Sequence, residues 1–434
     1  MRLTARQVRR FSPYSRFPAR RGRNHYKTLR EMVLFAPAEE LEPLGLFLAR
    51  AIAMIGAFDT PYNLDRHCTA LSDRFGPEAV LPFWLQALHY QKRDADAVAR
   101  AAEAAERMPH SASIQMQLVQ SLFLIGRVAD AGRHLRAAFD TLMQGPERGR
   151  RATVEMLIEL GMTDWLKAQP GIAGQFPQIA RATAFGPVRD EIDVLCISLR
   201  SAGARLKAVR YGARGAGRFT HVEGVYGRDL PRSAIDVLTH GRSAAMTASE
   251  VGCALSHLRA WEEVARLCGA QDYALVLEDD ARFIHGPGIG LSETLAAARA
   301  AGAGLVFVNS RACEKVCRTE PHSEVRLIPL GQATQGRLRP TNPGWGGDGY
   351  LLNGPMAAQL VQLWTRIGIA GALDWQMCLM CLDPDETDPP GHCRTMAETL
   401  RAEALRWTPL GGHVSDTPLI RSRDHGISSL NLES

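Results

Sequence analysis

Three consecutive acidic residues, Glu278, Asp279 and Asp280, are the side chains of this sequence best suited to chemistry. They follow residues 273–277, a short apolar run typical of a buried strand. Adjacent carboxylates repel one another, and a bound Mg²⁺ or Mn²⁺ ion relieves that repulsion through oxygen ligands. Alternate residues of an extended segment point the same way, so Glu278 and Asp280 are predicted to share one ion while Asp279 faces elsewhere. A solvated turn after the strand is the alternative interpretation.

The chain around the triplet alternates between short apolar runs and helix-length segments. Strands are predicted at residues 194–199, 221–226, 273–277 and 304–309, and helices at 247–267 and 291–302. The first helix should open with Ser249 as N-cap or with Glu250 in its first turn. The alternation predicts an α/β domain with a parallel sheet covered by helices on both faces. Ligands bind beyond the carboxyl ends of such strands, so residues 198–201 and 309–311 are expected beside the triplet.

Residues 38–168 are predicted to be all-α. Apolar residues recur three and four positions apart, and a shift of 34 residues places Leu88 on Leu122. This region resembles the tetratricopeptide repeat, with Gly126 and Ala131 at positions that favour small residues, and an alanine-rich helical bundle is the alternative. Either arrangement indicates a scaffold that could bind a protein partner, with no evident chemistry.

The predicted organisation therefore has four segments. A basic arm at residues 1–37 is expected to be disordered, and the helical-repeat domain follows at 38–168. A linker dotted with proline and glycine spans 169–190, and the α/β domain occupies 191–434.

The net charge of +5 is unevenly distributed. Residues 1–30 hold ten of the 51 Lys and Arg residues and no acidic residue, so the other 404 residues carry a net charge of −5. An acidic body argues against a dedicated nucleic-acid-binding protein. The arm suits an anionic membrane surface, with a solvated tail or nonspecific RNA binding as alternatives.

No membrane span is predicted, because the longest apolar stretch, residues 44–58, is too short and contains Arg50. The N-terminus also lacks the apolar core of a secretory signal. A cytoplasmic location is therefore expected, peripheral on the inner face of the cytoplasmic membrane if the arm binds there, with the nine cysteines reduced.

Several blocks of this sequence closely resemble glycosyltransferase family 25, the lipooligosaccharide galactosyltransferase-like family. They are residues 247–258 (TASEVGCALSHL) with Trp261, 274–281 (ALVLEDDA), 197–201 (ISLRS), 346–352 (GGDGYLL) with Ala357-Ala358, and Asp374-Trp375. The resemblance covers about residues 192–430. It implies a GT-A fold, a nucleotide-sugar donor such as UDP-galactose, and Mn²⁺ or Mg²⁺ on the donor diphosphate. The implied acceptor is a glycan or glycolipid such as lipopolysaccharide.

The same resemblance implies roles for individual residues. The triplet takes the place of an Asp-x-Asp motif, with Glu278, Asp280 and the C-terminal His425 as metal ligands, or His413 instead of His425. Asp374 is the expected general base of an inverting reaction, with substrate positioning as the alternative. Residues expected along the donor are Ser198, Leu199, Arg200, Arg205, Glu250, His257, Asp279, Asn309, Gly349 and Tyr350.

Some of these residues also have a purely structural interpretation. His257 could pack in the core, and Glu250 could cap its own helix. Tyr350 and Trp345 could form a platform for the sugar ring or could be core aromatics. Residues 202–217 depart from the family by lacking its common Arg-Arg pair, and the Cys378-x₂-Cys381 pair does not have zinc-finger spacing relative to the other cysteines.

Two other functions compete with transfer of a sugar. The first is a non-catalytic helical scaffold carrying a decayed transferase domain, against which the intact triplet and Asp374 argue. The second is metal-dependent phosphoryl transfer, but the sequence has no glycine-rich phosphate loop of the P-loop type.

Overall fold

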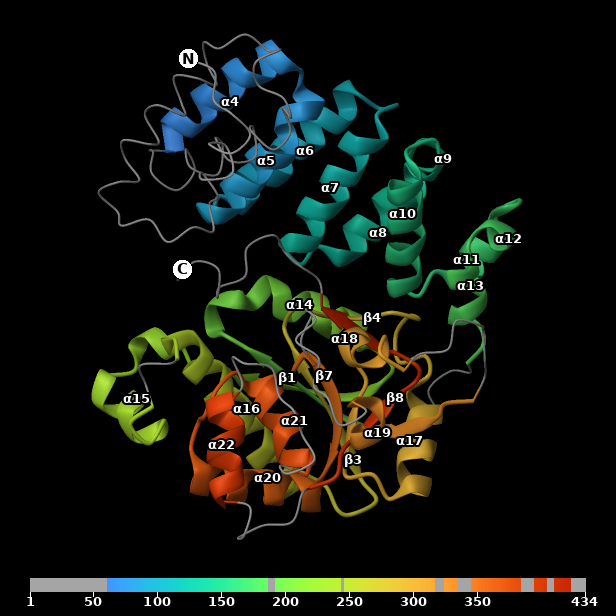
Figure 1. Cartoon of the computed structure of the whole chain (residues 1–434). Coiled ribbons are helices and arrows are strands. Elements are labelled where there is room, and N and C mark those ends of the chain that lie inside the picture. Colours follow the sequence, from blue (N-terminus) through green and yellow to red (C-terminus); the bar gives the residue numbers. More distant parts are fainter. Residues whose placement is uncertain are drawn as a thin grey trace. The chain divides into compact units, whose positions relative to one another are not determined.

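The computed structural model describes residues 61–185, 192–242, 246–316, 324–334, 345–383, 394–403 and 410–422. Contacts divide the chain into two compact units, residues 1–153 with 424–434 and residues 154–423 (Figure 1). The boundary at Thr153 comes before the domain boundary predicted at 168. The arm predicted at residues 1–37 and His425 lie outside the described residues.

The described part of the first unit is built from helices that pack against one another in chain order. They are α4 (Pro61–Phe75), α5 (Pro77–Tyr90), α6 (Asp94–Arg107), α7 (Ala112–Leu124), α8 (Val128–Ala137) and α9 (Phe139–Met143). Helix α6 buries Ala97, Ala101 and Ala105, spaced four residues apart on one face. These small side chains let the neighbouring helices approach closely.

The 34-residue period is visible in the backbone of two successive helical hairpins. In the α5–α6 and α7–α8 turns an arginine, Arg93 or Arg127, donates its backbone N–H to the carbonyl oxygen five residues earlier at 2.9 Å. The residue before each arginine has a positive φ, 61° at Lys92 and 73° at Gly126. The same hairpin turn therefore recurs after 34 residues, and the tetratricopeptide type of the repeat stays a prediction.

The second unit begins inside α10 (Glu147–Glu159) and continues through α11 (Thr163–Lys167). The predicted linker contains two more short helices, α12 (Ile172–Gln175) and α13 (Pro177–Ala182). Ile172 and Ile179 are buried, because these helices pack against α11 and each other. This segment is thus part of a packed structure.

A seven-stranded sheet organises the rest of the second unit. Its strands are β1 (Ile192–Ser198), β2 (Gly217–Glu223), β3 (Tyr273–Glu278), β5 (Leu305–Phe307), β6 (Leu327–Pro329), β7 (Gly349–Asn353) and β8 (His413–Ser415), in the order β2-β1-β3-β7-β5-β8-β6. Two short strands, β4 (Ala281–Phe283) and β9 (Ile420–Ser422), pair separately and antiparallel.

The prediction of a parallel sheet is right for β1, β2, β3, β5 and β8 but wrong for two strands. Strand β7 is antiparallel to both of its neighbours, β3 and β5, and β6 is antiparallel to β8. All five residues of β7 are buried. A strand buried on both faces has the same apolar pattern in either direction, so the sequence does not reveal its orientation.

Helices cover both faces of the sheet, as predicted, and create two cores (Figure 1). Alternate residues of β1 separate them, with Leu195 and Ile197 in one core and Val194 and Cys196 in the other. The first core contains residues of α16 (Ala248–Leu267), α20 (Gly354–Ile367), α21 (Leu373–Cys381) and α22 (Arg394–Glu403). The second contains residues of α14 (Gly203–Gly212) and α17 (Leu291–Ala301).

Helix α16 begins two residues earlier than an N-cap at Ser249 would require. Thr247 is its N-cap, since the Thr247 hydroxyl accepts the Glu250 backbone N–H at 3.2 Å and the Glu250 carboxylate accepts the Thr247 backbone N–H at 2.7 Å. This capping box satisfies donors that the first turn otherwise leaves without partners. The prediction of Ser249 as N-cap is wrong, and the placement of Glu250 in the first turn is confirmed.

Candidate active site

The acidic triplet lies at the carboxyl end of β3, between β1 and β7. Glu278 is the last residue of β3, and Asp279 and Asp280 form the turn into β4. Asp279 accepts a hydrogen bond from Ser198 Oγ at 2.8 Å and pairs with Arg205 at 3.0 Å. Burial raises the pKa of Asp279 in spite of Arg205. The middle carboxylate therefore faces the β1 side.

Asp280 is the least satisfied member of the triplet. Ser422 Oγ, on β9, donates to Asp280 Oδ2 at 2.6 Å, while Asp280 Oδ1 is buried without a hydrogen-bond partner among the described residues. Burial, and then the charges of Glu278 and Asp348, raise the pKa of Asp280 to about 7. An unpartnered buried oxygen beside other acids favours a bound cation, because the charge otherwise lacks solvation.

The glycine-rich residues 345–349 add an acid that sequence reasoning left without a role. Asp348 is fully buried and accepts a hydrogen bond from Arg311, but its Oδ2 has no hydrogen-bond partner among the described residues. Burial raises its pKa in spite of Arg311. Gly346 has a φ of +74°, and a Cβ there would lie 2.3 Å from Asp348 Oδ1. The sequence offered one signal for Asp348, namely its position between glycines just before a strand.

Two of the predicted site residues hold this loop in place. Asn309 is buried, and its side-chain amide donates to Gly346 O at 3.0 Å and Gly349 O at 3.2 Å. Asp374, in the first turn of α21, accepts the backbone N–H of Gly346 at 3.2 Å and of Trp375 at 3.0 Å. Asn309 is thus placed to position the loop, and Asp374 lies at its edge.

His257 links the helix α16 to the triplet. It is fully buried, with Nε2 3.3 Å from Glu278 Oε1 and Nδ1 2.8 Å from the Tyr350 hydroxyl, which also accepts a hydrogen bond from Trp261 Nε1 at 2.8 Å. Burial acts to raise the pKa of Glu278, but the hydrogen bond and charge of His257 outweigh it and lower that pKa. His257 is therefore a core histidine that also contacts the acidic cluster.

The predicted sugar platform is wrong. Tyr350 is 0% exposed and Trp345 is 1% exposed, so neither ring offers a face to a ligand. The physical reason is the position of Tyr350 on β7, which lies inside the sheet with helices over both of its faces. Both aromatics are part of the core.

The remaining predicted residues are more dispersed. Arg200 is exposed and pairs with Glu223 at 2.7 Å, and Leu199 is half-buried. Gly349 is packed against Ile420, where a Cβ would lie at 2.8 Å. His413 begins β8 beside Val306 of β5, and the C-terminal residue that contacts Asp280 is Ser422.

The donor types at the end of β3 are those that a divalent cation takes. Asp280 and Asp348 each direct a buried oxygen without a hydrogen-bond partner in the described part of the chain, which is the chemistry of a hard-ion site. A second arrangement uses other atoms. Within the described ranges, only Cys253, His257 and Glu278 bring three potential ligand atoms within 4.8 Å of one another. Cys253 was not among the predicted ligands.

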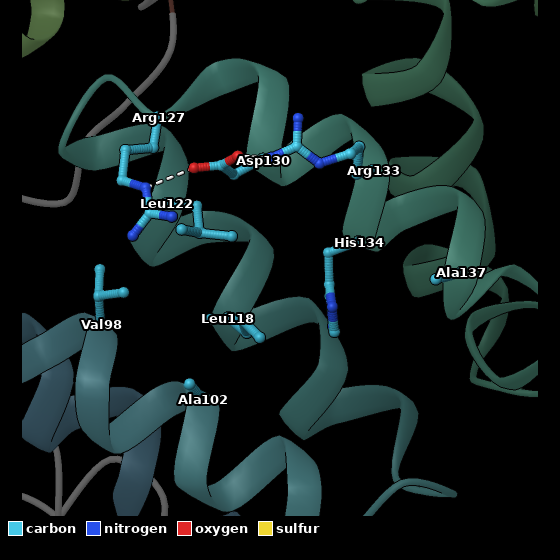
Figure 2. A pocket seen from close by; sticks show the side chains of 9 residues that line it. All are labelled: Val98, Ala102, Leu118, Leu122, Arg127, Asp130, Arg133, His134 and Ala137. Carbon is cyan, nitrogen blue, oxygen red and sulfur yellow. Dashed lines mark hydrogen bonds and ion pairs between the residues drawn. The ribbon is translucent and has the colours of Figure 1, made fainter.

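A different kind of hollow lies in the helical unit, between α6, α7 and α8 (Figure 2). It is an open hollow of about 420 Å³, and apolar side chains such as Val98 and Leu122 form part of its wall. Arg127 and Arg133 at its edge both pair with Asp130. One carboxylate there faces two guanidinium groups, so this edge keeps a net positive charge, and among the described residues no cysteine, serine or threonine lines the hollow.

Comparison with known proteins finds a family match within the second unit. Residues 192–374 match the family described as Glycosyltransferase family 25 (LPS biosynthesis protein). This segment contains the triplet, the glycine-rich loop and Asp374, so the resemblance drawn from the sequence is confirmed there. No curated protein and no solved structure matches the chain. Among the described residues, no helix has the length and apolar character needed to span a bilayer.

Proposed function

Because residues 192–374 match glycosyltransferase family 25, we propose that this protein transfers a hexose from a UDP-sugar to a glycan or glycolipid such as lipopolysaccharide. Galactose is the first candidate for the hexose. The observation that carries the proposal is the pair of buried oxygens, Asp280 Oδ1 and Asp348 Oδ2, without hydrogen-bond partners among the described residues. They lie beside the carboxyl end of β3, where α/β sheets bind ligands.

Glu278, Asp280 and Asp348 would hold a Mn²⁺ or Mg²⁺ ion on the donor diphosphate. When bound, such an ion stabilises the negative charge that develops on the leaving diphosphate. The chain prepares this site by fixing the carboxylates: Ser422 holds Asp280 and Arg311 holds Asp348. His425 remains a proposed further ligand outside the described residues.

Asp374 is the proposed general base. Its carboxylate borders the glycine-rich loop, and its charge acts on Arg311, which itself contacts Asp348. Each carboxylate oxygen accepts one backbone N–H, and an oxygen of this kind has a second lone pair for the proton of an acceptor hydroxyl. Arg205 and Ser198, which hold Asp279, form the proposed donor side of the site.

The test is a screen of nucleotide sugars and nucleotides with and without Mn²⁺, read as thermal stabilisation and as metal-dependent donor hydrolysis. Ligand at about 100 times its Kd stabilises the folded state by about 2.7 kcal/mol. UDP with Mn²⁺ should give such a shift, and UDP-galactose should be hydrolysed. If no nucleotide changes stability or is hydrolysed, the chain is a helical scaffold with a decayed transferase domain.

The remaining segments suggest how the enzyme meets its acceptor. Residues 1–30 would bind the anionic inner face of the cytoplasmic membrane, with about 1 kcal/mol for each Lys or Arg near the surface, and the helical repeats would bind a protein partner. Removing residues 1–30 should abolish pelleting with anionic liposomes while leaving transfer to a soluble acceptor intact. Equal pelleting of the truncated protein would exclude the arm as the anchor.

A further inference from the structure

Helix α16 presents a thiol and an imidazole to the end of β3. Cys253 and His257 are four residues apart and so lie on the same face of the helix. A ligand atom of each lies within 4.8 Å of the other and of a Glu278 carboxylate oxygen. We propose that Cys253, His257 and Glu278 form a binding site for a thiophilic divalent cation, Zn²⁺ in the first instance, distinct from the site at Asp280 and Asp348.

The ligand types select the class of ion. Thiolate and imidazole are preferred by Zn²⁺ and its heavier relatives, whereas Mg²⁺ and Mn²⁺ prefer oxygen ligands. One thiolate and one carboxylate balance the charge of a divalent ion when the imidazole is neutral. Three protein ligands leave the fourth tetrahedral position to water, the arrangement of an open zinc site.

The histidine is already oriented as a metal ligand requires. A zinc-bound histidine usually has its other ring nitrogen fixed by a hydrogen-bond partner, which sets the ring orientation. Here the Tyr350 hydroxyl lies 2.8 Å from His257 Nδ1 and is held in turn by Trp261 Nε1 at 2.8 Å. All three side chains are fully buried, so Nε2 is directed at Glu278 by the core itself.

The other two ligands can adjust around an ion. Zinc bonds of about 2.0–2.3 Å place tetrahedral ligand atoms about 3.5 Å apart, so the three atoms must close in slightly. Cys253 is partly exposed and the Glu278 side chain is 33% exposed, so neither of these two ligands is sealed in the core as His257 is. Burial, and then Glu278 and Asp374, raise the pKa of the Cys253 thiol, so binding releases its proton.

Glu278 belongs to both proposed cation sites, so Zn²⁺ binding should affect sugar transfer. This effect on transfer is the one part of the inference that rests on the proposed function. A thiophilic ion at Cys253 engages the carboxylate that the donor-bound ion would use. The two ions therefore compete, and Zn²⁺ should lower the affinity for Mn²⁺ and UDP. The chain would bind Zn²⁺ at this site whether or not it transfers a sugar.

The experiment titrates the metal-free, full-length protein with Zn²⁺ against a chromophoric chelator and with Cd²⁺ by its thiolate charge-transfer absorption. Cys253→Ser should lose one bound ion per chain, or at least about tenfold in affinity, and His257→Gln should do the same. Cys268→Ser is the matched control, because Cys268 is a partly exposed thiol at the other end of α16. Unfolding curves verify that each variant is folded.

Equal Zn²⁺ affinity in wild type and Cys253→Ser, or an equal loss in Cys268→Ser, overturns the site. The Asp280→Asn variant separates this inference from the proposed function, because it should lose Mn²⁺-dependent UDP binding and keep Zn²⁺ binding. Zn²⁺ binding without any nucleotide binding in the wild type leaves the cation site standing and removes the transferase. UDP binding with Mn²⁺ that Zn²⁺ does not weaken, together with unchanged Zn²⁺ affinity in Cys253→Ser, removes the cation site and keeps the transferase.

Discussion

The helical unit and the carboxyl end of β3 use the same charged residue types in opposite ways. In the helical hairpins Arg93 pairs with Asp96, and 34 residues later Arg127 pairs with Asp130. In each pair the arginine is the N-cap residue and the aspartate follows three residues later, and all four side chains are at least partly exposed. At the end of β3, by contrast, the charge of Asp348 acts on Asp280, and each of the two carboxylates has a buried oxygen without a hydrogen-bond partner among the described residues.

The difference teaches which charges stabilise the fold and which bind a ligand. Exposed ion pairs contribute about 0–1 kcal/mol each, so the repeated pairs adjust the helices without deciding their structure. Buried carboxylates that face one another cost free energy in the folded chain, and a cation removes that cost. The two repeated arginines therefore have carboxylate partners within the chain, whereas one oxygen each of Asp280 and Asp348 lacks a partner among the described residues, and a bound cation would supply it.

The largest effect among these predictions is the loss of metal-dependent UDP binding expected from Asp280→Ala. The substitution should remove Mn²⁺-dependent binding of UDP, a loss of ~10²-fold or more, because the ion loses a ligand in a buried site. Glu278→Ala should weaken binding less, since Glu278 already pairs with His257. Calorimetry with UDP and Mn²⁺ measures both. Asp130→Ala is the control, and unchanged affinity in the Asp280 variant would contradict the metal assignment.

Asp374→Asn should separate binding from turnover. Loss of a positioned base lowers the rate by ~10²–10⁴, while the donor still binds because the Asp280 and Asp348 cluster is intact. Steady-state transfer and calorimetric donor binding check this. Retained turnover would exclude the base role, and lost donor binding would assign Asp374 to positioning through Gly346.

Removing an ion pair within the second unit should lower the free energy of unfolding by an intermediate amount. Arg421 on β9 donates to Glu155 at 2.7 Å and also to Glu159, both on α10. Glu159 is 5% exposed, so Arg421→Ala leaves a buried charge without its main partner and should cost about 1.5–3 kcal/mol. Arg266→Ala removes an exposed pair with Glu263 and serves as the control. Equal denaturant midpoints for the two variants would contradict this ranking.

The pH dependence of stability should have opposite signs in the two regions. The folded-state pKa of Asp280, about 7, lies above its ordinary value, so its contribution is complete below about pH 4 and is lost as the pH rises through 7. Burial lowers the pKa of His134 in the helical unit, so its contribution is present above about pH 6.5 and is lost on acidification.

Hydrogen exchange of the metal-free protein at about pH 5.5 and pH 7.5 measures both signs. Amides of β3 should exchange faster at the higher pH after correction for intrinsic rates, and those of α8 at the lower pH, with differences on the order of 1 kcal/mol for Asp280 and less for His134. Asp280→Asn and His134→Gln should remove the respective dependence. A slope for β3 that persists in Asp280→Asn would assign it to other acids.

The smallest effect is expected in the helical unit. Asp130→Ala breaks the pairs with Arg127 and Arg133, whose side chains are exposed, and should cost less than about 1 kcal/mol. Thermal unfolding of the variant beside the wild type measures this. A loss as large as that of Arg421→Ala would show that the exposed pairs have a structural role beyond their surface position.

The sequence by itself determined the features that depend on neighbouring residues. The 34-residue hairpin period, the apolar strand before the triplet, the alternation that makes an α/β domain and the family motifs all arise from local spacing. Local spacing also placed Glu250 in the first turn of α16, although it could not choose Thr247 over Ser249 because both are good N-caps.

Only the tertiary structure decided which groups meet. Ser422 contacts Asp280 across 142 residues, and the antiparallel insertion of β7 brings Asp348 beside Glu278 and buries Tyr350. The alternation of residues along a strand predicts which face of the sheet a side chain occupies, but it does not predict which strand is the neighbour. A strand buried on both faces has the same apolar pattern in either direction. The unpartnered carboxylate oxygens and the approach of Cys253 to Glu278 are therefore products of strand order and helix packing, which no local pattern records.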